Sequence, residues 1–148
     1  MYDVIVVGAG HAGCEAANIA AKMGSKVLLI TMNMETIAKM SCNPAMGGVA
    51  KGQIVRELDA LGGLSAIVSD YSMMQFRMLN LSKGPAMWSP RTQNDRTLFA
   101  LKWRELLENN FNVDFLQDSV SEMLVDKNKV TGVLSSSGNK HFSKSVIL

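Results

Sequence analysis

Three glycines near the N-terminus have a spacing that suits the binding of a phosphate group. In the pattern G-x-G-x-x-G, the first glycine allows a tight turn, the second lets the backbone approach a pyrophosphate, and the third lets a helix pack closely on a strand. Unpaired N–H groups and the dipole at a helix N-terminus favour negative charge. The sequence therefore predicts that a dinucleotide's pyrophosphate lies on residues 8–13, namely Gly8, Ala9, Gly10, His11, Ala12 and Gly13.

Cys42 is the side chain best suited to nucleophilic chemistry. Pro44 biases the preceding residue to extended geometry, which places Cys42 in a loop. Gly47 and Gly48 follow, ahead of a helix expected over residues 53–61, and their N–H groups are expected to face the same ligand. A thiol in such a loop can acquire a lowered pKa and act as a nucleophile. A small buried hydrophobe is the alternative reading of Cys42.

The remaining candidates have plainer interpretations. Cys14 is expected to pack in the core, and the backbone of His11 matters more than its ring. Four basic residues surround a proline-rich loop, where they either meet phosphates or form a solvated face: Arg77, Lys83, Arg91 and Arg96.

The segments around the first glycines predict a βαβ unit. Residues 3–7 and 26–30 are apolar runs typical of buried parallel strands, and the alanine-rich residues 14–24 fit a helix packed on a sheet. Dinucleotide-binding folds commonly place an acid after the second strand to hold ribose hydroxyls. That acid is missing here, and Thr31 or Asn33 would make weaker hydrogen bonds in its place.

Further along the chain, the pattern predicts an α/β protein. Short helices are expected at 33–40 and 64–69, a strand at 74–79, and the longest helix from residues 91–96, where Thr92 and Asp95 are spaced like a capping box. An antiparallel β-meander is expected to precede a final parallel strand at 144–148; its strands are residues 113–117, 120–125, 129–135 and 140–143. The fold class is thus Rossmann-like, with a parallel central sheet and an inserted meander.

Composition excludes several classes of protein. Two cysteines are too few for a disulfide framework or a cysteine-ligated zinc site, and we expect no metal. The 15 basic and 13 acidic residues leave a net charge of +2, which neither predicts nor excludes binding to nucleic acid. The sequence has no apolar stretch of membrane-spanning length and no signal peptide, which predicts a cytoplasmic protein without a membrane anchor.

Six segments are together far more specific than a dinucleotide fingerprint. They are GAGHAGCEAA (8–17), MSCNPAMGGVAKG (40–52), ELDALGG (57–63), QFRMLN (75–80), KGPA (83–86) and RTQNDR (91–96). These residues resemble the glucose-inhibited division protein A family, the flavoprotein subunit of an enzyme that modifies tRNA uridine. The resemblance covers the whole chain and implies that residues 1–148 are the N-terminal part of an FAD/NAD(P)-binding domain in a longer protein, with residues 70–110 considered as an inserted subregion.

The resemblance also implies a cofactor, a reaction and partners. FAD would lie with its adenine end near Val120, and Thr31 is usual in the family. NADH would reduce the flavin, and methylene-tetrahydrofolate would supply a carbon that is joined, with glycine or ammonia, to C5 of the tRNA wobble uridine. Cys42 matches a family cysteine implicated in activity, as a thiol that adds to uracil or assists the flavin. The family works as a homodimer with a GTPase partner.

Two alternatives to this function stay open at the level of sequence. One is a different FAD oxidoreductase with two dinucleotide-binding domains, and the other is a non-catalytic module that holds a nucleotide. The family's NAD-binding and C-terminal regions would lie beyond Leu148, so we expect this chain by itself to be inactive.

Overall fold

The computed structural model describes residues 1–40 and 43–148, which form two compact units. The first unit combines Met1–Ala38 with Glu105–Leu148, and the second is Lys39–Arg104. Ser41 and Cys42 lie outside the described residues.

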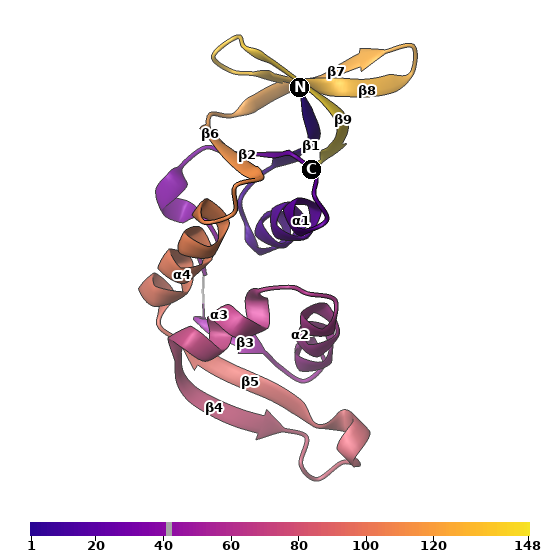
Figure 1. Cartoon of the computed structure of the whole chain (residues 1–148). Coiled ribbons are helices and arrows are strands. Elements are labelled where there is room, and N and C mark those ends of the chain that lie inside the picture. The colour runs from indigo at the N-terminus through magenta and orange to yellow at the C-terminus, as the bar shows by residue number, and fades with distance from the viewer. Residues whose placement is uncertain (41–42) are drawn as a thin grey trace. The chain divides into compact units, whose positions relative to one another are not determined.

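The first unit is built on a six-stranded sheet in the order β6-β2-β1-β9-β8-β7 (Figure 1). Helix α1 (His11–Lys22) packs against β1, β2 and β6, and its alanines allow the close approach. The 3-10 turn η1 (Met34–Thr36) follows β2. The strands are β1 (Tyr2–Val7), β2 (Val27–Thr31), β6 (Val113–Gln117), β7 (Val120–Asp126), β8 (Lys129–Ser135) and β9 (Lys140–Ile147).

The expected βαβ unit is confirmed, since β1 and β2 pair in parallel on either side of α1. All five residues of β2 are buried. Ile5, Leu28, Ile30 and Val133 form a core cluster, so the apolar character of these strands reflects the burial of their side chains. At about 25 cal/mol per Å² of apolar surface, such burial is the main favourable contribution to folding.

The expected four-stranded meander is partly wrong. Residues 113–117 form β6, which pairs in parallel with β2 and belongs to the central sheet. β9 is a single strand that pairs antiparallel with β8 through residues 140–142 and in parallel with β1 through residues 143–147. The antiparallel part therefore consists of β7, β8 and the start of β9 and continues the central sheet.

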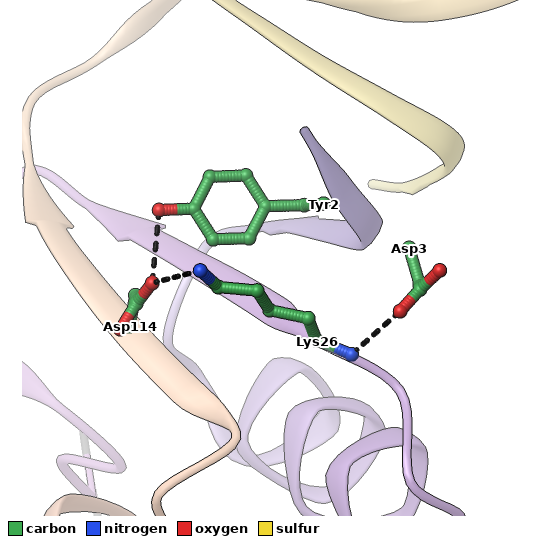
Figure 2. Close-up of polar contacts among 4 residues, drawn as sticks. All are labelled: Tyr2, Asp3, Lys26 and Asp114. Atoms are coloured by element: carbon green, nitrogen blue, oxygen red, sulfur yellow. Dashed lines mark hydrogen bonds and ion pairs between the residues drawn. The ribbon is translucent and has the colours of Figure 1, made fainter.

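A polar cluster joins the beginnings of three parallel strands, at the edge opposite their carboxyl ends (Figure 2). The hydroxyl of Tyr2 donates to Asp114 at 3.0 Å, and the ammonium of Lys26 lies 3.7 Å from the same carboxylate. The N–H of Lys26 donates to Asp3 at 2.8 Å. Burial, and then the bond to Asp114, raise the pKa of Tyr2. The cluster links residues at the beginnings of β1, β2 and β6.

The second unit contains a three-stranded antiparallel sheet in the order β3-β5-β4. Its strands are β3 (Ala45–Gly47), β4 (Met73–Leu79) and β5 (Ser89–Asn94). Helix α2 (Lys51–Ala60) packs against α3 (Ser65–Ser72), β3 and β5, and the 3-10 turn η2 (Pro85–Met87) lies between β4 and β5. The expected strand at 74–79 and helices at 53–61 and 64–69 are thus confirmed, with shifted ends.

The helix predicted to start within residues 91–96 begins later than expected. Residues 91–94 are in β5, and α4 covers Arg96–Glu108. The carboxylate of Asp95 accepts bonds from the N–H groups of Thr97 and Leu98, at 2.8 and 2.9 Å. Asp95 is therefore the N-cap of α4, and the expected Thr92–Asp95 capping box does not form. The helix expected at 33–40 is only the turn η1.

In the described part of the chain, no helix combines the length and apolar character that crossing a bilayer requires.

Candidate functional site

A hollow of about 410 Å³ lies at the carboxyl ends of β1, β2 and β6 in the first unit. We call it the strand-end hollow. Its volume falls within the roughly 300–1,000 Å³ of small-molecule sites, and ligands of open α/β sheets bind at this edge. It is lined by Val7, Gly8, Ala9, Gly10, Ile30, Thr31, Met32, Thr36, Asp118, Ser119 and Val120.

Five of the residues expected to bind cofactor line this hollow, and they come from distant parts of the chain. Gly8, Ala9 and Gly10 belong to the turn after β1, Thr31 ends β2, and Val120 starts β7. His11, Ala12 and Gly13 belong to the first turn of α1 and do not line it. The structure thus brings together the glycine turn, the end of β2 and the start of β7.

The glycines of this turn have distinct physical roles. Gly8 has φ of +99°, which other residues rarely adopt, and its N–H donates to Ile30 O at 2.8 Å. A Cβ on Gly13 would lie 1.8 Å from Gly8 O, so Gly13 allows α1 to pack on the turn. A Cβ on Gly10 would meet no atom of the protein within 4 Å. Gly10 therefore leaves its side of the backbone open to a ligand.

The start of α1 is suited to an anion. Gly10 is the N-cap residue, no side chain in the described part of the chain caps the helix, and its first turn has no acid. The N–H groups of a helix's first turn have no partner within the helix, and the dipole gives this end a partial positive charge. The glycine turn can therefore hold a phosphate by backbone N–H groups.

The other side of the strand-end hollow carries an acid that the sequence reasoning missed. Asp118 directly follows β6, and its N–H donates to Thr31 O at 2.9 Å. The hydroxyl of Thr31 donates to Asn33 O at 3.3 Å, while the Asn33 side chain accepts from Glu35 N. Because β6 pairs in parallel with β2, Asp118 stands beside the position where the expected acid was missing. Recognising residues 113–117 as a parallel strand would have revealed it.

Hydrogen bonds keep the Asp118 carboxylate ionised. The Ser137 hydroxyl donates to it at 2.5 Å, and the Ser119 N–H donates to it at 2.7 Å. These bonds favour the charged form and, with the Ser137 bond as the largest cause, lower the pKa of Asp118 to about 2. At neutral pH the carboxylate is therefore only an acceptor, suited to hydroxyl or amine donors of a ligand.

The ring of His11 has a structural contact. Its Nε2 donates to Ala38 O at 3.0 Å, and the N–H of Ala38 donates to Ala9 O at 2.8 Å. These bonds tie the segment after η1 to the glycine turn. That the backbone of His11 matters more than its ring for binding stays a prediction.

Gly47 and Gly48 lie in the second unit, at the end of β3. Gly47 has φ of +91°, and a Cβ there would lie 2.1 Å from Pro90 O on β5. Gly48 O accepts bonds from the Ser89 hydroxyl and from Gly52 N. The close approach of β3 and β5 is thus a structural reason for Gly47, and a role of either glycine in binding stays a prediction.

Of the two cysteines, the structure describes only Cys14. Cys42, the predicted nucleophile, lies outside the described residues. Cys14 is fully buried in α1 and donates to Ala9 O at 3.4 Å. Burial raises the pKa of the Cys14 thiol to about 12, so this cysteine is inert packing, as expected.

Comparisons with known proteins identify the family. The family model for Glucose inhibited division protein A matches residues 3–148. A relative from Cytophaga hutchinsonii, named tRNA uridine 5-carboxymethylaminomethyl modification enzyme MnmG, is 71% identical over 147 residues, which are 99% of this chain and 24% of the relative. A relative of the same name from Christiangramia forsetii is 65% identical over 99% of this chain and 23% of its own length.

The solved structures agree with this result. GidA from Aquifex aeolicus has a TM-score of 0.96 and 45% identity, covering 98% of this chain and 24% of that protein. A GidA-related protein from Thermus thermophilus, at 21% identity, 98% and 51% coverage and a TM-score of 0.66, shares the fold. The chain spans about a quarter of the length of the curated relatives that it matches. The chain belongs to the glucose-inhibited division protein A family.

Proposed function

We propose that this chain is the FAD-binding portion of an enzyme that adds a carboxymethylaminomethyl or aminomethyl group to C5 of the tRNA wobble uridine. The strand-end hollow is the observation that supports this proposal. It joins an open glycine backbone at the start of a helix to hydrogen-bond acceptors at the ends of two further strands, β2 and β6. The names of the relatives from Cytophaga hutchinsonii and Christiangramia forsetii supply the substrate class. The whole protein uses NADH and methylene-tetrahydrofolate and works in the cytoplasm as a homodimer with a GTPase partner.

The residues present fit the adenosine diphosphate half of FAD. The first-turn N–H groups of α1 bind the pyrophosphate, and the missing Cβ of Gly10 leaves room for it. Asp118 and Thr31, beside each other at the strand ends, accept hydrogen bonds from ribose hydroxyls or the adenine amine. Val120, which packs on the core beneath the hollow, contacts the adenine end. Bound FAD supplies redox chemistry through its isoalloxazine ring.

The first test is the absorbance spectrum of the full-length protein that carries this chain. We expect bands near about 370 and 450 nm, which are typical of a bound flavin, and FAD as the nucleotide released on denaturation. A tRNA with unmodified wobble uridine should then be modified when the flavoprotein is combined with its GTPase partner and supplied with NADH, methylene-tetrahydrofolate and glycine or ammonia. A colourless protein that takes up no added FAD would contradict the flavoenzyme proposal. The remaining alternative would be a non-catalytic module that holds a nucleotide.

Cys42 is the residue that we propose for the chemical step on the uridine. Changing Cys42→Ser in the full-length protein should abolish tRNA modification while leaving its FAD content unchanged, because a hydroxyl is a far weaker nucleophile than a thiolate. Cys14→Ser is the matched control, since its hydroxyl can donate the same bond to Ala9 O. Retained modification in the Cys42→Ser protein would remove this thiol from the mechanism.

A further inference from the structure

The second unit carries a polar hollow of about 240 Å³ that the proposed function does not use. We call it the arginine hollow. It is lined by four side chains on one face of the β4–β5 pair: Gln75, Arg77, Arg91 and Gln93. All four residues are exposed.

The strand register brings these side chains together. β4 and β5 are antiparallel, with Arg77 opposite Arg91 and Gln75 opposite Gln93. Residues two apart on a strand point to the same face, and directly opposed side chains have Cβ atoms about 4.5–5.5 Å apart. The sequence showed these arginines only as basic residues on either side of a loop, and the pairing makes them neighbours.

The opposite face of this strand pair is anchored. Asn94 is buried, and its amide donates to Ser69 O at 2.7 Å and to Ser72 Oγ at 3.0 Å on α3. Its side-chain oxygen accepts from the Thr92 hydroxyl at 2.8 Å, and its N–H donates to Pro44 O. These bonds hold β5 against the helix, so that the arginines are presented on a fixed scaffold.

No acidic side chain in the described part of the chain forms an ion pair with the arginines of the arginine hollow. Like charges directly opposite each other on a sheet are destabilising. Among residues 1–40 and 43–148, neither Arg77 nor Arg91 has an ion pair or a side-chain hydrogen bond, and the two glutamines are neutral. Two guanidinium groups with free donors on one small surface favour an anion between them.

The shape and chemistry of the arginine hollow narrow the choice of anion. Guanidinium groups bind phosphate by paired, planar hydrogen bonds. The hollow is smaller than the roughly 300–1,000 Å³ that encloses a small ligand, so it suits one phosphate of a longer strand better than a whole nucleotide. Glutamine side chains can both donate and accept, as contacts with sugar hydroxyls and base edges require.

We propose that Arg77 and Arg91 bind a backbone phosphate of the RNA substrate. Gln75 and Gln93 then lie beside the adjoining sugar. This inference rests on the proposed function, since it locates part of the tRNA-binding surface. The phosphate of a free nucleotide has the same chemistry and is the alternative ligand for the arginine hollow.

The test measures how tRNA binding depends on salt in the full-length flavoprotein. The double variant Arg77→Gln/Arg91→Gln should bind unmodified tRNA at least about tenfold more weakly, because it loses hydrogen bonds to a charged group. Its slope of log K against log salt should fall by about 1, the value for one phosphate contact. The variant Arg77→Lys/Arg91→Lys should keep the slope but lose affinity, because lysine keeps the charge without the planar fork.

Arg56→Gln is the matched control, an exposed arginine of the same unit on α2. The double glutamine variant should unfold at the same or a higher temperature than the wild type, since it removes a like-charge pair. Binding of tRNA equal to that of Arg56→Gln would overturn the inference. The inference would also be overturned if the double glutamine variant bound ADP more weakly but tRNA as tightly as the wild type. That result would assign the arginine hollow to a free nucleotide. If the wild-type protein binds no tRNA, the proposed function itself fails.

Discussion

Replacing Gly13 by alanine is expected to destabilise the first unit by about 3 kcal/mol or more, at or above the upper end of the range for overpacked sites. The new Cβ would lie 1.8 Å from Gly8 O, a backbone atom that no side-chain rotation can move. Either α1 must lift from β1 or the glycine turn must deform. Urea unfolding of the full-length protein without cofactor, followed by far-ultraviolet circular dichroism, measures the loss.

Gly84→Ala is the control for this substitution. Gly84 has φ of −63°, and a Cβ there would meet no atom within 4 Å. Its effect should stay within about 0.5 kcal/mol, as for ordinary surface changes. If Gly13→Ala has the same urea midpoint of unfolding as the wild type, the close contact between α1 and the glycine turn is not a feature of the folded protein.

The Gly10→Ala change is expected to affect binding without affecting folding. Gly10 has φ of −72°, which alanine adopts without strain, and its Cβ would point into open space. In the proposed complex the pyrophosphate occupies that space, next to the backbone of Gly10. Loss of one hydrogen bond to a charged group costs about 1.5–3 kcal/mol, so the Kd for FAD should rise about 10- to 100-fold.

A fluorescence titration of the full-length apoprotein with FAD measures this effect, again with Gly84→Ala as the control. The urea midpoint of Gly10→Ala without cofactor should equal that of the wild type. An unchanged Kd would mean that the ligand does not approach the backbone at Gly10. The pair of variants at Gly10 and Gly13 separates the binding role of the turn from its packing role.

The structure differs from the sequence-based expectations most clearly at β5. Its sequence, SPRTQN, contains proline and polar residues that local rules assign to a loop or a helix start. The strand exists because β3 and β4 pair with its two edges, and because Ser89, Thr92 and Asn94 are buried with hydrogen-bond partners. Neither condition is visible in a local window of residues.

Asp118 shows the same limit at the site. The sequence shows that Asp118 follows an apolar strand. Whether this acid belongs to the site depends on which strand pairs with β6. The parallel pairing of β6 with β2 places Asp118 next to Thr31. Reading residues 113–117 as part of an antiparallel meander concealed this neighbour.

The sequence by itself determined the βαβ unit, the roles of Gly8 and Gly13 and the family. These features depend on backbone dihedral preferences, on apolar periodicity and on motifs that lie within short stretches of chain. Tertiary structure alone decided that β6 joins the parallel sheet, that Asp118 faces the strand-end hollow, and that Arg77 lies opposite Arg91. Strand neighbours and register are selected by burial and hydrogen bonding between distant segments, and a local pattern does not record these interactions.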